Sequence, residues 1–141
     1  MLSKKTKYAL NALVYIARHP DRQPIPTRVI SEEQNIPLKF LEAILVELKN
    51  ARILNSKKGK YGGYSLNHPP EEINMAEITR LFDGSIALVP CVTTRFYERC
   101  EECIDEKTCG IRQVFMEIRH ETLQKMKSAT LANILEREKM L

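Results

Sequence analysis

The sequence predicts a mainly α-helical protein with one small β-hairpin and a long helix near its C-terminal end. Three observations predict this fold class. Apolar residues recur every three or four positions in the first 50 residues, they do so again after residue 109, and a glycine-rich turn separates two short runs between residues 53 and 66. With 141 residues, of which 43% are hydrophobic and 28% charged, the chain has the size and composition of one packed domain.

Three helices are predicted in the first 50 residues. The first has an apolar face from Tyr8 onward and ends near Pro20, and the second has Pro26 as its first residue and is broken at residues 35–37. The third, residues 38–50, carries its leucines on one face and its charged residues off it. Two short helices joined by a tight turn, the second amphipathic, predict a helix-turn-helix, although any small helical bundle shows the same pattern.

Two short strands around a basic glycine turn follow the third helix. The strands are predicted within residues 53–58 and 64–66, and the turn within residues 59–63. This is the outline of a wing, whose glycines allow positive φ angles and a close approach to a DNA groove. The predicted DNA-contacting residues of the wing are Lys57, Lys58, Lys60 and Tyr61.

Positive charge is concentrated in this first part of the chain. Residues 1–60 hold twelve Lys/Arg and five Asp/Glu, a net charge of +7, whereas the rest carries −3. Lys and Arg displace counterions from phosphates, so the basic part is a candidate surface for a polyanion. The alternative is an ordinary solvated charged face.

The remaining sequence predicts two further helices, a loop and a last short helix. A fourth helix covers residues 75–82, and residues 90–108 form an irregular loop that contains three of the four cysteines and ends just before the fourth, Cys109. A long helix starts at Cys109 with an apolar stripe that needs a partner, and Thr130 caps a last helix. We therefore divide the chain into residues 1–70, with the predicted helix-turn-helix and wing, residues 71–108, with a connecting helix and the cysteine-rich loop, and residues 109–141, with the long helix that needs a partner and a C-terminal helix.

With these features the chain resembles the Rrf-type winged-helix transcription factors of bacteria, the group that includes the IscR, NsrR and CymR regulators. The resemblance covers nearly the whole chain. Its marks are residues 7–10, 36–42 and 59–66, and the cysteine loop before a long helix. It implies a winged helix-turn-helix with a long dimerisation helix, hence a homodimer that pairs through antiparallel helices and binds a roughly palindromic operator in double-stranded DNA.

The resemblance also implies which residues read the operator. By position, Lys39 and Glu42 of the third helix face bases in the major groove, and the wing reaches the adjacent minor groove. A carboxylate accepts a hydrogen bond from cytosine N4 but repels phosphate, so Glu42 is expected to tune sequence choice rather than affinity. The alternative is that Glu42 is a surface partner of Lys39 or Lys49.

Four cysteines lie within nineteen positions: Cys91, Cys100, Cys103 and Cys109 have eight, two and five residues between them. In a cytosolic protein such a cluster indicates a metal site or a redox switch rather than a structural disulfide framework. Thiolates are ligands for iron–sulfur clusters and for zinc. Cys109 stands at the start of the long helix, where the helix dipole favours a thiolate.

Cluster-binding relatives use three cysteines in this loop, which Cys91, Cys103 and Cys109 match. Some relatives supply a histidine three residues after the last cysteine as the fourth ligand, but Arg112 occupies that position here, and Lys7 replaces the acid that others use. Cys100 is the expected replacement. The resemblance therefore implies an iron–sulfur cluster, 2Fe-2S or 4Fe-4S, that senses iron–sulfur supply, nitric oxide or redox state.

Other functions of the loop stay open. Zinc could bind four thiolates, but only one Cys-x-x-Cys pair is present. The same pair could be a thiol switch, or the active dithiol of an oxidoreductase, although no thioredoxin-like pattern surrounds it. A regulator of this fold could also sense a protein partner or a metabolite without a cluster. No arrangement of residues typical of catalysis is found, so we expect no enzyme.

No apolar run approaches the ~20 residues that a membrane span needs. The N-terminal residues imitate a signal peptide, but Asn11 interrupts the apolar stretch and no cleavage site follows. We therefore expect a cytoplasmic protein with no membrane partner.

Overall fold

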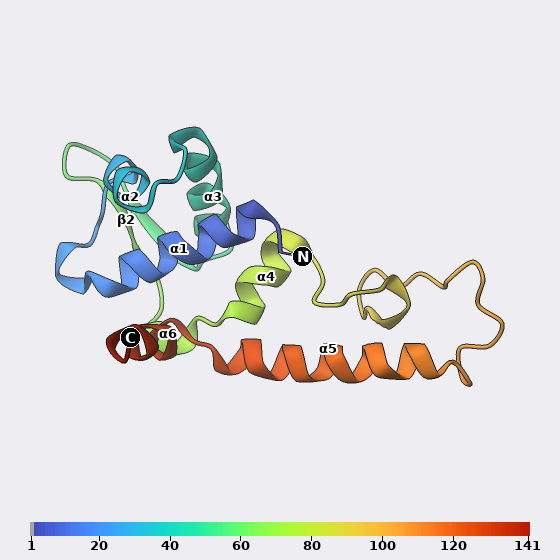
Figure 1. The fold of residues 1–141 in the computed structure, drawn as a ribbon. Coiled ribbons are helices and arrows are strands. Elements are labelled where there is room, and N and C mark those ends of the chain that lie inside the picture. The colour runs from blue at the N-terminus through green and yellow to red at the C-terminus, as the bar shows by residue number, and fades with distance from the viewer. Residues whose placement is uncertain (1) are drawn as a thin grey trace.

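The computed structural model, which describes residues 2–141, contains six α-helices and a single two-stranded sheet (Figure 1). The predicted fold class, mainly helical with one small hairpin, is confirmed. One-turn 3-10 helices cover Pro20–Arg22, Pro70–Glu72 and Pro90–Val92. In chain order the main elements are α1 (Lys4–Arg18), α2 (Thr27–Gln34), α3 (Leu38–Asn50), β1 (Leu54–Lys57), β2 (Gly63–Leu66), α4 (Met75–Asp83), α5 (Gly110–Ser128) and α6 (Leu131–Lys139).

Capping residues set the helix bounds and explain where they differ from the prediction. Helix α1 begins at Lys4 rather than Tyr8 because Ser3 caps it, its hydroxyl accepting a hydrogen bond from the Thr6 N–H at 3.1 Å. Pro26 is the N-cap of α2 rather than its first residue. The Thr130 cap predicted for the last helix is confirmed, since its hydroxyl accepts from the Asn133 N–H at 3.0 Å.

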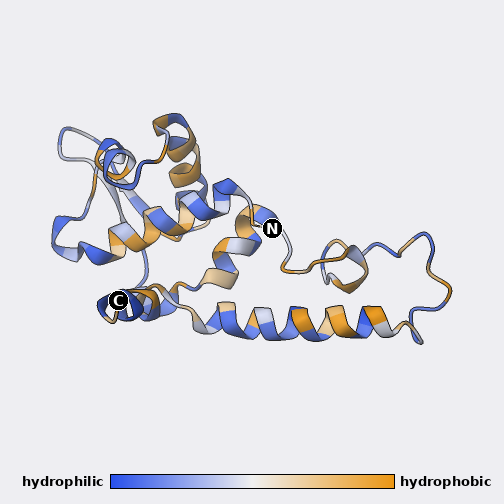
Figure 2. Cartoon of the chain, in the orientation of Figure 1, coloured by the Kyte–Doolittle hydropathy of each residue, from blue (hydrophilic) through white to orange (hydrophobic). Residues whose placement is uncertain are grey.

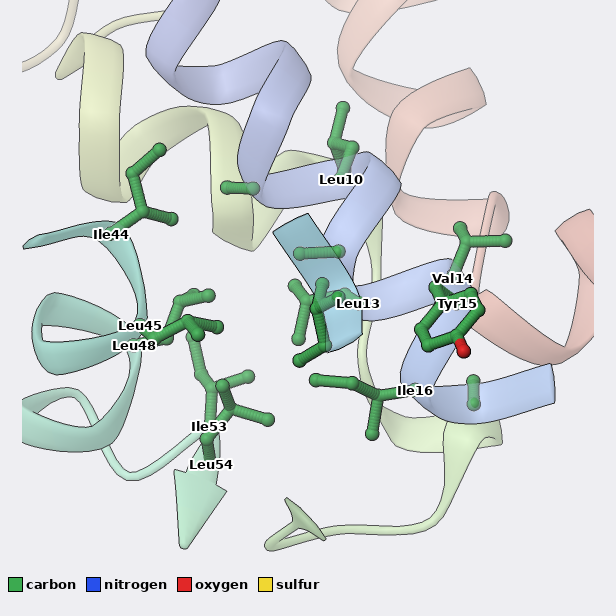
Figure 3. Packing of buried hydrophobic residues seen from close by; sticks show 14 of the residues in the cluster. Leu10, Leu13, Val14, Tyr15, Ile16, Ile44, Leu45, Leu48, Ile53 and Leu54 are labelled. Atoms are coloured by element: carbon green, nitrogen blue, oxygen red, sulfur yellow. The ribbon is translucent and has the colours of Figure 1, made fainter. Parts of the chain in front are cut away.

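Helices α1, α2 and α3 and the two strands form the N-terminal part of the structure, which we call the head. Its core lies between α1, α3 and the first strand (Figure 3). Leu13 and Ile16 of α1 and Leu45 of α3 are fully buried there. Helix α6 also contributes, because Leu131 is 1% exposed and belongs to the same cluster. The outer ends of α1 and α6 are joined by an ion pair in which Arg18 contacts both carboxylate oxygens of Glu138, at 2.9 and 2.7 Å.

The wing is fixed to the rest of the head by main-chain hydrogen bonds. Strands β1 and β2 pair antiparallel from Leu54↔Leu66 to Lys57↔Gly63. Beyond them, Ile25 and Tyr64 exchange two N–H···O bonds of 2.9 Å each, so the segment before α2 adds a bridge beside β2. At Gly63 a Cβ atom would lie 2.3 Å from the Ile25 carbonyl group, so only glycine allows this approach.

Helix α5 stands apart from the head along most of its length (Figure 1). None of its 19 residues is buried, although hydrophobic residues recur along it (Figure 2). Of the predicted stripe, Ile111, Val114 and Ile118 are 72%, 54% and 38% exposed. This apolar side does not make α5 a membrane span, because no helix within residues 2–141 is long and apolar enough to cross a bilayer.

Main-chain hydrogen bonds join the end of α5 to the start of α4. The Met75 N–H donates to the Ala129 carbonyl at 3.0 Å, and the Leu131 N–H donates to the Ile73 carbonyl at 2.9 Å. The C-terminal end of α4 and the N-terminal end of α5 are joined by the long segment that contains the four cysteines, which Figure 1 shows extending along α5 to its far end.

Candidate functional site

The outward face of α3 carries the two residues predicted to read bases. Lys39 and Glu42 are both exposed, and the buried residues of α3 lie on its other side. Within residues 2–141, Glu42 forms no ion pair with Lys39 or Lys49. Both predicted side chains are therefore free to contact another molecule.

Glu42 lies close enough to the wing to act on Tyr64 electrostatically. Burial raises the pKa of the Tyr64 hydroxyl above its ordinary value, and the negative charge of Glu42 raises that pKa further. The carboxylate of Glu42 on α3 therefore lies within electrostatic range of the second strand of the wing.

The four residues predicted at the wing lie at its tip or beside it. Lys57, Lys58 and Lys60 are exposed, and Tyr61 is 77% exposed with its ring centroid 5.6 Å from the Lys60 Nζ atom. The turn between the strands is closed by a hydrogen bond from the Gly62 N–H to the Gly59 carbonyl at 3.0 Å. Figure 1 shows this turn and α3 on the side of the head that faces away from α5.

All four cysteines line one open cavity of ≈ 780 Å³ between the loop and the first turns of α5, and all four are free thiols. Carboxylates also line it, and so do two arginines. This surplus of acidic groups favours a cation over an anion as the occupant. The charged lining residues are Glu98, Arg99, Glu101, Glu102, Asp105, Glu106 and Arg112.

Cys109 and Cys91 are held by the same residue of α5. Cys109 is the N-cap of the helix, and its Sγ accepts a hydrogen bond from the Arg112 N–H at 3.4 Å. The Arg112 side chain turns to the other segment of the loop, where Nε donates to the carbonyl oxygen of Cys91 at 3.2 Å. Arg112 therefore connects the first and the last cysteine.

Cys100 and Cys103 form a separate turn. The Cys103 N–H donates to the Cys100 carbonyl at 3.1 Å, and Arg99 donates to the Cys103 carbonyl at 3.2 Å. The Cys100 thiol donates to Glu102 Oε2 at 3.2 Å, and this hydrogen bond raises the pKa of the thiol while it lowers the pKa of the Glu102 carboxyl. In this conformation Cys100 is a protonated hydrogen-bond donor rather than a thiolate.

The four thiols share a cavity, but they are not gathered around one point. Within the described residues, 2–141, no three His, Cys, Asp or Glu side chains are placed to hold a metal ion. The structure brings Cys91 and Cys109 together through Arg112 and brings Cys100 and Cys103 together in a turn. For all four sulfur atoms to bind one centre, the loop has to change its conformation.

Two arginines and a tyrosine hold the loop in ways that the sequence analysis missed. Arg99 and Arg112 donate to main-chain carbonyls at cysteines, and the Tyr97 hydroxyl donates to the Glu106 carboxylate. That bond raises the pKa of Tyr97. In the sequence, basic and acidic residues alternate with the cysteines of this loop. This pattern indicates that hydrogen bonds can form there, but it does not say which residues form them.

The family model described as Rrf2, an iron-dependent transcriptional regulator, matches residues 2–137 of this chain. The chain belongs to the Rrf2 family. It is similar to an rrf2-like HTH-type transcriptional regulator of Rhodobacter capsulatus, with 38% identity over 96% of this chain and 92% of that protein. An IscR regulator of Aliivibrio salmonicida is 34% identical over 64% of this chain and 60% of its own length.

Solved structures of Rrf2-family proteins have the same fold. CymR, described as the global cysteine regulator of B. subtilis, superimposes with a TM-score of 0.80 and 26% identity over 97% of each chain. The resemblance recognised from the sequence is thus confirmed, as is the expectation that the chain is no enzyme. This Rrf2 protein is a transcriptional regulator with a DNA-binding helix-turn-helix.

Proposed function

We propose that this Rrf2 protein is a cytoplasmic homodimer that binds a palindromic operator and senses iron–sulfur supply, nitric oxide or redox state through an iron–sulfur cluster. The observation that carries the sensing part is that all four cysteines line one cavity at the N-terminal end of α5. A ligand there contacts both the loop and the longest helix of the chain.

The operator is bound by the exposed face of α3 and by the wing. Lys39 and Glu42 contact base edges in the major groove, and Lys57, Lys58 and Lys60 contact phosphates or the minor groove with Tyr61 beside them. The support is their exposure, the electrostatic effect of Glu42 on Tyr64 of the wing, and the net charge of +7 in residues 1–60. A half-site of DNA is then read by each head.

The homodimer forms through α5. A 19-residue helix with no buried residue and with Ile111, Val114 and Ile118 exposed leaves an apolar surface in water unless another chain covers it. A second α5, packed antiparallel, covers it by the same side chains. Dimerisation also places two heads on one DNA molecule, as a palindromic operator requires.

The donor set of the cavity fits an iron–sulfur cluster. Its four thiols are the soft ligands that such clusters use, and Cys91, Cys100, Cys103 and Cys109 would hold it. When bound, the cluster supplies one-electron redox chemistry at a potential set by its charge, hydrogen bonds and exposure. Cys100 has to exchange its hydrogen bond to Glu102 for that role, and Arg112 already holds the Cys91 main chain near Cys109.

A thiol switch is the second candidate function, and the turn between Cys100 and Cys103 favours it. Two cysteines closed by a main-chain hydrogen bond in an exposed loop can form a disulfide with little movement of the chain. Zinc bound by the same four thiols is a further alternative, as is a protein or metabolite partner that is sensed without a cluster. Of these candidates, only an iron–sulfur cluster would give the protein a visible colour.

The sensing proposal is tested by purifying the protein without oxygen and recording its visible spectrum with its iron, sulfide and zinc contents. We expect a brown protein with equal iron and sulfide, and loss of both in Cys91→Ser, Cys103→Ser and Cys109→Ser. Glu136→Gln, in the exposed part of α6, serves as the control. A colourless protein with zinc, or with no metal, contradicts the cluster and leaves the DNA-binding part standing.

The DNA-binding part is tested by the salt dependence of operator affinity. Each phosphate contact contributes about 0.9 to the slope of log affinity against log salt, so the triple variant Lys57→Ala, Lys58→Ala, Lys60→Ala should flatten it. The matched control removes three exposed lysines elsewhere, Lys107, Lys125 and Lys127. An unchanged slope in the first variant means that the wing does not contact DNA.

A further inference from the structure

The outward face of α3 carries apolar residues that the packing of this chain does not use. Phe40 is 62% exposed and Val46 is 46% exposed, and Ala43 between them is exposed as well. Because three residues are close to one helical turn, the three side chains follow one another along one side of the helix. The opposite side carries the core residues Leu41, Ile44, Leu45 and Leu48, each 0% exposed.

We infer that this apolar row, Phe40, Ala43 and Val46, reads thymine methyl groups in the major groove of the operator. The inference rests on the proposed function, in which α3 is the recognition helix. It goes beyond that function because it states which base the helix selects and by which atoms. The row then makes thymine at fixed positions of each half-site a requirement for tight binding.

Charge identifies DNA as the molecule that covers the row. Lys39 and Lys49 lie on the exposed side of α3, and the wing adds three exposed lysines to the same surface of a head whose first 60 residues carry +7. A polyanion is attracted to such a surface, whereas a second copy of this basic head is repelled. The row itself has no charge to offer a phosphate, so its contacts are to groups inside the groove.

The base edges in the major groove offer one methyl group that the apolar row can contact. In the major groove all four bases present hydrogen-bond donors or acceptors, and the 5-methyl group of thymine is the apolar exception. Helix α3 contains no arginine, the residue that most often reads guanine, and its exposed polar residues are Lys39, Glu42, Lys49 and Asn50. Apolar contact with thymine therefore supplies a large part of the selectivity, with Glu42 accepting from cytosine beside it.

The test uses uracil, which differs from thymine only by the missing methyl group. An operator is first selected from random double-stranded DNA with the full-length protein, and each thymine of a half-site is then replaced by uracil in turn. We expect one or two positions at which uracil weakens binding about fourfold, the factor that ~0.8 kcal/mol per buried methyl group corresponds to.

Variants assign the effect to the row. Val46→Ala, Ala43→Ser and Phe40→Ala should each reduce the uracil effect at one position, because the apolar group that contacts the methyl group is truncated in two variants and made polar in Ala43→Ser. Met140→Ala, which truncates an 87% exposed apolar residue at the far end of α6, is the matched control and should leave it unchanged. All four sites are exposed, and thermal unfolding checks that each variant folds.

Three results would overturn the inference. Uracil could replace every thymine without loss of affinity, the loss could be the same in all three variants as in the wild type, or Val46→Ala could change the oligomeric state, which would make the row an interface between copies. A protein that selects no sequence from the library contradicts the proposed function itself. The two failures are therefore distinguishable.

Discussion

Arg112 Nε donates a hydrogen bond to the carbonyl oxygen of Cys91 at 3.2 Å, across 21 positions of sequence. The N–H of the same residue donates to Cys109 Sγ at 3.4 Å. One residue of α5 thus holds the first cysteine of the loop and contacts the last. If the cysteines bind the proposed cluster, Arg112 would position two of its ligands, at the position where the family resemblance implies a histidine ligand in some relatives.

Replacing Arg112 with alanine should release the Cys91 segment from α5. Partners of this kind, one shell outside the ligands, change metal affinity by roughly 10–100-fold when they are removed. We expect the variant to lose iron or zinc to a chelator faster than the wild type and to exchange amide hydrogens faster in residues 90–92. Arg137→Ala, at an exposed site in α6, is the control. Equal metal loss in both variants would show that the hydrogen bond does not position Cys91.

Gly63→Ala should detach the wing from the segment before α2. Its Cβ would lie 2.3 Å from the Ile25 carbonyl carbon and oxygen, so the paired main chains must separate. Overpacking of this kind costs about 1–3 kcal/mol, which thermal unfolding detects as a lower Tm. Gly110→Ala is the matched control, because a Cβ there meets no atom within 4 Å. A wild-type Tm for Gly63→Ala would contradict the close approach.

Val114→Glu should turn the dimer into monomers. It places a charge in the middle of the apolar side of α5, and burying that charge costs roughly 3 kcal/mol or more, about a hundredfold in the dimer dissociation constant. Analytical ultracentrifugation measures the mass, and operator affinity should fall with it. Glu117→Gln on the same helix is the control. A dimer that survives Val114→Glu unchanged would place the interface elsewhere.

Acid should remove a stabilising contribution that Asp83 makes to the packing of α4 against α1. Burial raises the pKa of the Asp83 carboxyl, but hydrogen bonds from Ser3 and Thr6 outweigh burial and hold that pKa below its ordinary value of 3.8. The Ser3 N–H donates to Asp83 Oδ2 at 3.2 Å. A lowered pKa in the folded state means that the stabilisation is present above pH 3.8 and is lost as the pH falls through the folded pKa.

Urea unfolding of Asp83→Asn at pH 7, 5 and 3 measures this contribution. We expect the variant to unfold at lower urea than the wild type at pH 7 and 5, and the difference to become smaller at pH 3. Glu77→Gln, on the exposed side of the same helix, removes the same charge and should show no such convergence. A constant difference at all three pH values would mean that Asp83 acts through packing alone.

Local sequence patterns were sufficient for much of the fold. The bounds of α3 were predicted at residues 38–50 because a proline precedes a clear apolar face, and Thr130 was recognised as a cap from its place before that face of α6. The start of α1 was missed by four residues, because three lysines beside Thr6 hide the helix from an analysis of apolar periodicity. There the Ser3 cap, rather than hydrophobic burial, sets the boundary.

Contacts between distant residues could not be predicted in this way. The bridge between Ile25 and Tyr64, the packing of Leu131 into the head and the bond from Arg112 to Cys91 depend on the three-dimensional path of the chain. The cysteines were recognised from their spacing, and the structure places them around one cavity. Their roles as ligands stay a prediction, as do the base contacts of Lys39 and Glu42.

The main-chain bonds between residues 73–75 and 129–131 have a mechanical consequence. They fix α4 and α5 to each other at one end, while the cysteine loop connects their other ends. If a bound ligand shortened the loop, these other ends would be drawn together and the two helices would rotate about the fixed end. In the homodimer proposed above, the rotation would occur in both chains and would change the separation of the two α3 helices, which would have to match about 34–36 Å of DNA.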